Sequence, residues 1–276
     1  MFTDLSTARF QRQRDIHPGS YFTSVGSYFI SVIVTSINRI LITTVHRLQL
    51  SKKIYRVELY DSRTGDRLDQ VHVDHLPESI CMHKSGIAAV TIRPDKVKFI
   101  NVKNNKITLG KELKVKPGVS GITNSGDNLA VSYDKRPWLE VISTEGKVLH
   151  QFKENGKGQH FKRPDFLTST NDGCIYVSDW RTDTITKLDG RLNLLQTFTT
   201  NLLHYPRVIT AVCDDQLIVC TRWFSSIDLL RLSTGKMSRL LGKEDGLCLP
   251  RSVSYCHESK TIYVGSFHRV KVYAFM

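Results

Sequence analysis

An arginine follows a short apolar run six times along the chain, at intervals of roughly 44 residues. The six are Arg47, Arg93, Arg136, Arg181, Arg222 and Arg269. Each apolar run, such as residues 87–90 or 175–177, is too short for a helix and has the composition of a buried strand. A repeating strand at this interval limits the chain to folds built from one recurring unit.

Proline and turn-forming residues recur with the same period. The prolines that precede strand-like segments are Pro77, Pro117, Pro164, Pro206 and Pro250. Proline at such a place stops a preceding strand from running on. Glycine or asparagine, which tolerate positive φ, mark hairpin turns at residues 63–65, 103–105, 144–146, 188–190 and 233–235. One unit therefore contains four strands.

Four strands in about 45 residues are the signature of a propeller blade. The sequence predicts an all-β, six-bladed propeller of four-stranded blades, forming one domain over residues 1–276. The expected blades are roughly 26–74, 76–116, 117–160, 163–201, 204–245 and 248–276. The last unit lacks a fourth strand, so we expect the N-terminal segment 1–25 to supply it and close the ring.

The cysteines bear on metal binding and on the cellular compartment. None of the 6 cysteines belongs to a CxxC pair, which argues against a zinc finger, a RING or a redox motif. Their places beside apolar runs suggest buried free thiols in a reducing compartment, and so a cytoplasmic location. The apolar stretch 25–45 contains Asn38 and Arg39, which favour two strands over a membrane span. We predict no membrane contact.

The fourth and sixth units resemble NHL repeats, over residues 163–190 and 249–273, while units one to three do so weakly. Over roughly residues 28–276 the chain most resembles the C-terminal propeller of tripartite-motif (TRIM-NHL) proteins, without their RING and B-box. The resemblance implies a platform for protein partners and, in some members, for single-stranded RNA. Without a RING, we expect any association with ubiquitin-ligase components to come only through a partner.

The candidate binding residues fall in loops that open onto one face of such a ring. They are Arg136, Trp138, Trp180, Arg181, Arg222 and Trp223, with Arg163, Arg207 and Arg251 from the blade-to-blade loops. Tryptophan and arginine are the types most often found at protein interface hot spots. Rings interleaved with cations, in a chain of net charge +13, would also suit single-stranded RNA. The same side chains could instead be scaffold contacts between blades.

We predict a non-catalytic module that binds a protein partner through this basic face, with single-stranded RNA as the alternative. The sequence contains no GxSxG, P-loop or HExxH motif. Asp134 and Asp179 are the acids expected near the channel, and two acids do not make a hard-cation site. Asp179 is expected to stabilise a turn instead. We therefore predict no enzyme, cofactor or metal, and a metal-dependent propeller hydrolase or lyase is the least favoured alternative.

Overall fold

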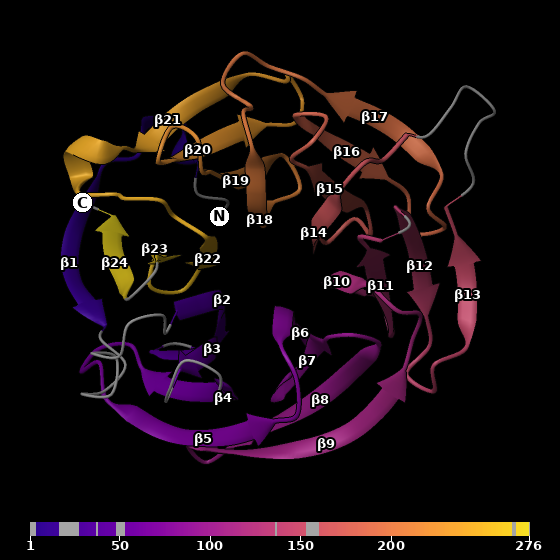
Figure 1. The fold of residues 1–276 in the computed structure, drawn as a ribbon. Coiled ribbons are helices and arrows are strands. Elements are labelled where there is room, and N and C mark those ends of the chain that lie inside the picture. Colours follow the sequence, from indigo (N-terminus) through magenta and orange to yellow (C-terminus); the bar gives the residue numbers. More distant parts are fainter. Residues whose placement is uncertain are drawn as a thin grey trace.

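Six antiparallel sheets surround a central channel in the computed structural model (Figure 1). The structure describes residues 4–16, 28–36, 38–47, 53–135, 137–152, 160–266 and 269–275. Each sheet has four strands, and the first strand of each unit lies nearest the channel. The predicted six-bladed propeller is confirmed.

The first three blades follow the chain from the inside of the ring outward. Blade one contains β2 (Tyr28–Ser36), β3 (Arg39–Arg47), β4 (Lys53–Asp61) and β5 (Arg67–Val73). Blade two contains β6 (Pro77–Lys84), β7 (Ile87–Ile92), β8 (Lys96–Lys103) and β9 (Lys106–Lys114). Blade three contains β10 (Val119–Ser125), β11 (Asn128–Tyr133), β12 (Trp138–Ile142) and β13 (Val148–Gln151).

The next two blades repeat the pattern, and the last departs from it. Blade four contains β14 (Pro164–Ser169), β15 (Ile175–Asp179), β16 (Thr184–Leu188) and β17 (Leu194–Phe198). Blade five contains β18 (Pro206–Cys213), β19 (Gln216–Thr221), β20 (Ser226–Arg231) and β21 (Met237–Leu241). Blade six combines β22 (Ser252–Cys256), β23 (Thr261–Gly265) and β24 (Val270–Phe275) with β1 (Phe10–Ile16).

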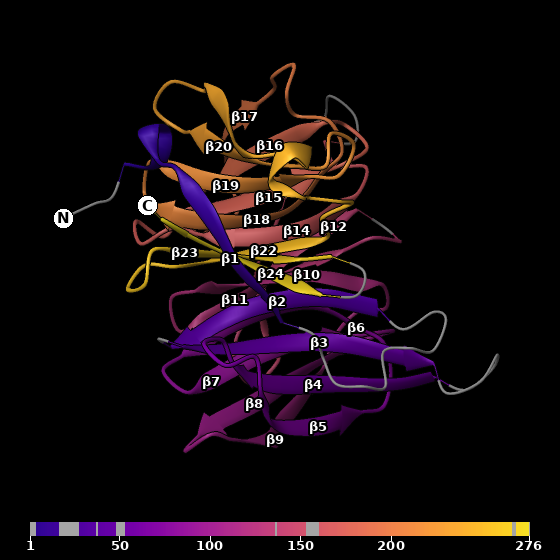
Figure 2. The same ribbon diagram turned by 90° about the vertical axis from the view of Figure 1, so that its left-hand side faces the viewer.

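The N-terminal strand closes the ring, as predicted. Strand β1 pairs antiparallel with β24, from Phe10 opposite Phe275 to Ile16 opposite Val270 (Figure 2). The short 3-10 helix η1 (Leu5–Thr7) precedes it, and η3 (Lys243–Asp245) follows β21. In the part of the chain that the structure describes, no helix has the length and apolar character needed to cross a membrane.

The hairpin turns confirm four of the five expected positive-φ sites. Gly65, Asn105, Gly146 and Gly235 all have positive φ. In blade four the left-handed residue is Leu192, with φ of 67°, instead of the expected glycine at 190. Asp189 accounts for the difference, because its carboxylate accepts hydrogen bonds from the backbone N–H groups of residues 191 and 193 and fixes a longer turn.

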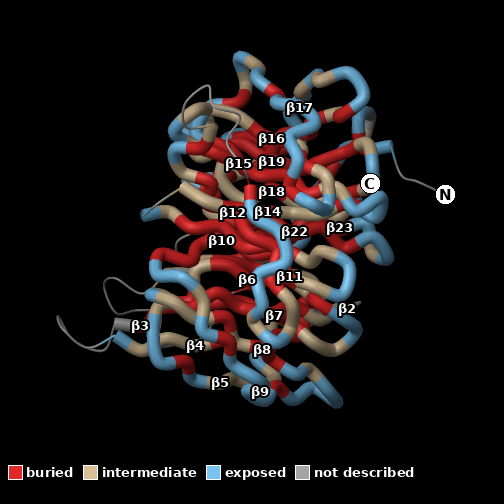
Figure 3. The backbone as a smooth tube through the Cα atoms, turned by 90° about the vertical axis from the view of Figure 1, so that its right-hand side faces the viewer, coloured by how far each residue is buried: buried red, intermediate tan, exposed pale blue. Residues whose placement is uncertain are grey.

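The hydrophobic core is divided among the six blade-to-blade interfaces. Each of six clusters combines apolar side chains of two adjacent blades; one of them joins Val219 of blade five to Tyr176 of blade four. Buried residues therefore concentrate in the second and third strands of the blades, such as β15, β19 and β20, whereas outer strands such as β9 and β13 are largely exposed (Figure 3). Packing of neighbouring blades supplies most of the burial that stabilises the ring.

One glycine marks a close approach of two inner strands. A Cβ at Gly121 on β10 would lie 2.7 Å from the carbonyl oxygen of Asp165 on β14 and 2.8 Å from Ser132 Oγ. We expect Gly121→Ala to destabilise the fold by about 1–3 kcal/mol, because the two blades must move apart. Thermal unfolding checks this against Gly190→Ala, whose Cβ would meet its nearest neighbour at an ordinary 3.5 Å. Equal melting temperatures for the two variants would contradict it.

Candidate functional site

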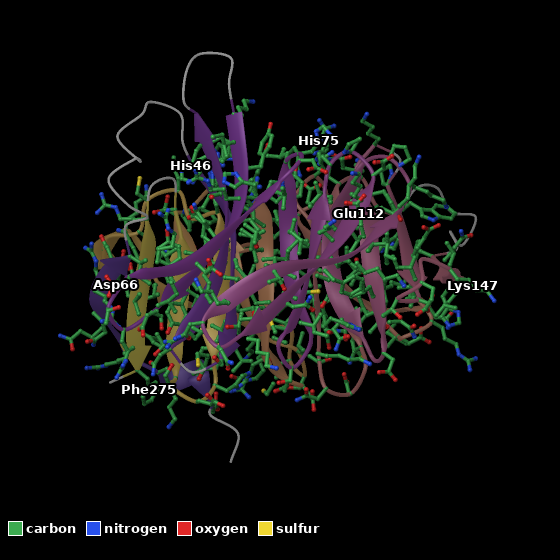
Figure 4. The ribbon with its side chains drawn as sticks, turned by 90° about the horizontal axis from the view of Figure 1, so that it is seen from below. His46, Asp66, His75, Glu112, Lys147 and Phe275 are labelled. Carbon is green, nitrogen blue, oxygen red and sulfur yellow. The ribbon has the colours of Figure 1, made fainter. Side chains whose placement is uncertain are left out.

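One face of the ring collects the loops that join second to third strands and each blade to the next; we call it the arginine face. His46, near the end of β3, and His75, between β5 and β6, lie at this edge of the molecule, and Phe275 lies at the opposite edge (Figure 4). The channel is lined by all six inner strands and has a volume of about 340 Å³. Residues at the start of the inner strands therefore surround its mouth on the arginine face.

A chain of ion pairs crosses the mouth from blade two to blade four; we call it the mouth chain. Arg93 Nε lies 2.5 Å from Glu78 Oε1, and Arg93 Nη2 lies 2.7 Å from Asp134 Oδ2. The chain continues through Arg163, whose Nη2 lies 3.4 Å from the same Asp134 oxygen and whose Nε lies 3.5 Å from Asp165 Oδ1. On this half of the mouth, arginine and acid alternate and neutralise one another.

Asp165 ends the mouth chain as a buried acid, and its Oδ1 makes the ion pair with Arg163 without a hydrogen bond. The residue is 7% exposed, and its Oδ2 accepts a 2.7 Å hydrogen bond from Trp180 Nε1. Its Oδ1 has no hydrogen-bond partner among the described residues. Burial raises the pKa of Asp165 even though the charge of Arg163 and the hydrogen bond from Trp180 oppose the rise. A carboxylate of this kind holds a proton more readily than an exposed one.

The other half of the mouth holds three arginines, which we call the arginine triad: Arg207, Arg222 and Arg251. Arg207 is the second residue of β18, Arg222 directly follows β19, and Arg251 directly precedes β22. Among the described residues no salt bridge involves Arg207 or Arg222. Arg207 instead lies over the ring of Phe166, 5.2 Å from its centroid. The triad therefore places three positive charges beside the channel, and Asp165 and Glu78 are the carboxylates whose charges act on Arg207.

The pKa shifts in the triad reflect this crowding. Burial lowers the pKa of Arg207, and the charge of Arg222 lowers it further. Burial lowers the pKa of Arg251 to about 10, with added repulsion from both other members of the triad. Like charges held together out of water raise the free energy of the folded state. An anion bound between them would relieve that repulsion.

The predicted residues Trp180, Arg181 and Trp223 do come together, through a residue that the sequence did not single out. Tyr205 lies between the two tryptophans, with ring centroids 5.0 Å from Trp180 and 6.1 Å from Trp223. The guanidinium carbons of Arg163 and Arg181 lie 5.6 Å and 5.4 Å from the Trp180 ring centroid. These three rings form a continuous aromatic stack on the arginine face.

Trp138 belongs to a separate pocket between blades two and three. Its Nε1 donates a 3.2 Å hydrogen bond to the buried Glu140, and Lys116 Nζ lies 5.4 Å from its ring centroid. The pocket has a volume of about 520 Å³ and is lined by Lys116, Pro117, Tyr133, Lys135 and Trp138. No described contact joins Trp138 to the other predicted site residues. The structure thus places Trp138 at the arginine face, in a pocket apart from the other predicted site residues.

The remaining predictions have mixed outcomes. Arg136 lies outside the described residues. Asp179 has the turn-stabilising role expected of it, because its Oδ2 accepts from the backbone N–H of Arg163 at 2.8 Å and its Oδ1 from that of Arg181 at 2.9 Å. Asp134 serves the mouth chain. The described residues include no cluster of three or more His, Cys, Asp or Glu side chains suited to holding a metal ion.

Sequence reasoning missed Glu78 and Asp165 as members of the site. The signal was present, because each directly follows the repeat proline, at Pro77 and Pro164, in the position that Arg207 occupies after Pro206. A polar residue at the start of an inner strand faces the mouth whichever charge it carries. Aligning the residue after each repeat proline would therefore have found the acids together with the arginines.

Comparison with known proteins finds likeness in structure alone: no family model and no curated protein matches the chain. Virginiamycin B lyase from Staphylococcus aureus, in a catalytically inactive form with quinupristin, has a TM-score of 0.66 at 14% identity, covering 97% of this chain and 100% of that one. A streptogramin B lyase has a TM-score of 0.64 at 12% identity, covering 99% and 100%. A protein of unknown function from Bacteroides thetaiotaomicron has a TM-score of 0.71 at 12% identity, and the match covers 97% of this chain and 73% of that one.

These comparisons correct the functional prediction from sequence. The non-catalytic module for a protein partner or single-stranded RNA was wrong, because the similar propellers of known activity named above are lyases and none is described as a protein- or RNA-binding domain. Identities of 12% and 14% establish a common fold. The function of the arginine face must therefore be argued from its own geometry.

Proposed function

We propose that the arginine face binds a small anionic molecule, through a carboxylate or phosphate group held by the arginine triad. The observation that carries the proposal is the state of Arg207 and Arg222, which have no salt bridge among the described residues. Guanidinium groups are well matched to carboxylate and phosphate oxygens, because their donors form a planar fork. Burial lowers the pKa of Arg207 and the charge of Arg222 lowers it as well, so an anion bound beside these two side chains would offset their repulsion.

The channel mouth suits a small ligand. The mouth chain pairs the arginines of blades two and four with acids, whereas Arg207 and Arg222 of blade five have no salt bridge among the described residues. One similar propeller was solved with quinupristin, a small molecule. A propeller of this shape can therefore accommodate a ligand of that size class.

The test is titration calorimetry with inorganic phosphate and with citrate, at low ionic strength. The double variant Arg207→Ala with Arg222→Ala is expected to weaken binding by about 100-fold or more, because it removes two charge-assisted hydrogen bonds, each worth about 1.5–3 kcal/mol. The matched control is Arg63→Ala with Arg191→Ala, which removes the same charge from turns on the opposite face. The control should bind as the unmodified protein does.

Two results would overturn the proposal. One is that neither phosphate nor citrate binds. The other is that both double variants weaken binding equally, which would show attraction to the net charge of +13 rather than to the triad. Thermal unfolding of each variant shows whether weaker binding results from loss of the binding site or from unfolding of the protein. Because burial lowers the pKa of Arg207, we expect its removal to leave the melting temperature unchanged or higher.

An elimination reaction at the same mouth is a second candidate function, favoured by Asp165. A buried carboxylate beside an anion site, with a raised pKa and an oxygen that accepts no hydrogen bond, can accept a proton from the carbon next to a bound carboxylate. The electrons then form a carbon–carbon double bond as the substituent on the next carbon departs. The similar lyases make this class of reaction the one to test first.

The proton-transfer step can be followed by NMR as exchange of the carbon-bound protons of citrate in D₂O. Asp165→Asn keeps an acceptor for Trp180 Nε1 and removes the base. We expect exchange with the unmodified protein and none with the variant, at unchanged citrate binding. Equal exchange rates would remove Asp165 from this role.

Two narrower expectations from sequence remain proposals. The likeness of units four and six to NHL repeats suggests common ancestry with that family, and the six-bladed fold is consistent with it. A cytoplasmic location is supported by the cysteines: all six are free, and Cys81, Cys220 and Cys256 are buried.

A further inference from the structure

The aromatic stack ends in a ring that is open to solvent. Trp223 is 71% exposed, the highest value among the exposed large apolar side chains of the described residues. One face of its indole lies against Tyr205, and no other described ring or cation lies against it. An exposed tryptophan beside a charged site points to recognition of a ligand.

The inner members of the stack offer a ligand less open surface than Trp223 does. Tyr205 has a tryptophan on each side, and Trp180 has Tyr205 together with the guanidinium groups of Arg163 and Arg181. The indole N–H of Trp180 is also taken, by Asp165. Trp180 and Tyr205 therefore hold the stack in place, and Trp223 presents its surface.

The loop before β18 fixes the position of the stack. Tyr205 has a positive φ of 53°, and its backbone N–H donates to Asp183 Oδ1 at 2.9 Å. Its carbonyl oxygen accepts from the backbone N–H of Arg222 at 3.4 Å. This last contact ties the ring stack to the arginine triad, because Arg222 and Trp223 are adjacent residues of one loop.

We infer that Trp223 adds a stacking subsite to the anion site, so that the ligand joins a flat aromatic ring to its carboxylate or phosphate group. The inference rests on the proposed function, because it takes the triad as the site of the anionic group. The triad binds the charge, and the open face of Trp223 covers the ring. A ring stacked on an indole gains about 0.5–1.5 kcal/mol beyond its buried area.

The experiment compares three probes by titration calorimetry: inorganic phosphate, 1-naphthyl phosphate and 1-naphthoate. We expect 1-naphthyl phosphate to bind about 10-fold more tightly than phosphate, from the stacking energy above. Trp223→Ala should abolish that advantage and leave the affinity for phosphate unchanged. The fold is not at risk in this variant, because the side chain is mostly exposed. The matched control is Leu195→Ala, at an apolar residue on β17 that is 53% exposed.

Each outcome decides one of the two proposals. The stacking subsite is overturned if phosphate binds and the naphthyl ring adds no affinity, or if the added affinity survives Trp223→Ala. Either result leaves the anion site standing. Absence of binding by all three probes would overturn both. If 1-naphthyl phosphate or 1-naphthoate binds more tightly than inorganic phosphate, and Trp223→Ala removes the difference, the subsite is supported. The naphthyl compound that binds more tightly then identifies the anionic group.

Discussion

Deleting residues 4–16 together with the residues before them is expected to abolish cooperative folding of the whole ring. The segment 4–16 carries three buried apolar side chains at the junction of blades five, six and one: Leu5 of η1 and Ile16 of β1 at 0% exposure, and Phe10 of β1 at 8%. Their removal alone costs about 6 kcal/mol, at roughly 2 kcal/mol for each side chain. Proteins of this kind are stable by about 5–15 kcal/mol in total.

The deletion also opens the ring. It leaves β24 as an unpaired edge, which is a template for aggregation. It removes the tie between Asp4 and Arg231 of blade five, whose atoms lie 2.7 Å apart. Circular dichroism on heating would show no cooperative unfolding transition for the truncated chain. Size-exclusion chromatography would show large aggregates.

Point variants within β1 separate the strand from its core side chains. Phe10→Ala with Ile16→Ala should lower the melting temperature strongly, whereas Gln11→Ala with Gln13→Ala, at exposed positions of the same strand, should not. If the truncated chain melted within a few degrees of the full chain, the closing strand would not hold the ring together.

The fold could be predicted because its determinants repeat. Strand, proline and turn recur together, so each unit confirms the reading of the others. Because the last unit lacks a fourth strand, the pattern also indicated that the N-terminal segment supplies that strand and closes the ring. The one turn that was misplaced, at Leu192, follows from a local competition that the repeat does not encode: the Asp189 side chain captures two backbone N–H groups.

The site was harder to predict, because partners at the mouth come from different blades. Trp138 and Trp180 both lie where a second strand connects to a third, yet Trp138 opens β12 and Trp180 directly follows β15. Trp138 donates to Glu140 two residues away, whereas Trp180 donates to Asp165 on the inner strand. That choice depends on where a buried acid lies, which the period does not reveal. Tyr205 was missed for a similar reason, since the ring is brought between two tryptophans by a left-handed residue that the sequence does not mark.

Buried acids also recur on the third strands of alternate blades, and Glu58 shows what they contribute. Glu58, Glu140 and Asp228 pair in register with a central apolar residue of the second strand in blades one, three and five, and all are at most 1% exposed. The Glu58 carboxylate lies 3.3 Å from His46 Nε2 and 3.4 Å from Arg67 Nη1, and it accepts a 3.0 Å hydrogen bond from Tyr60. Each acid thus organises polar groups inside a blade interface.

We expect Glu58→Ala to destabilise the fold by about 3–5 kcal/mol at neutral pH, because it leaves buried donors and cations without their partner. The control is Glu112→Ala on the surface, whose ion pairs with Lys96 and Lys98 are worth about 0–1 kcal/mol. Chemical denaturation measures both. If the two variants lost similar amounts of unfolding free energy, burial would not determine how much these acids contribute to stability.

The effect of Glu58→Ala should also depend on pH in a defined direction. Burial alone would raise the pKa of Glu58, but the hydrogen bond and charge of His46, with smaller effects of Tyr60 and Arg67, outweigh burial and hold the pKa below its usual range. A depressed pKa in the folded state contributes stability that is complete above the unfolded value of about 4.3 and is lost as the pH falls through the folded value. The stability difference between Glu58→Ala and the unmodified protein should therefore narrow below about pH 4. A difference that stays constant from neutral to acid pH would show that the variant loses packing rather than the ionised carboxylate.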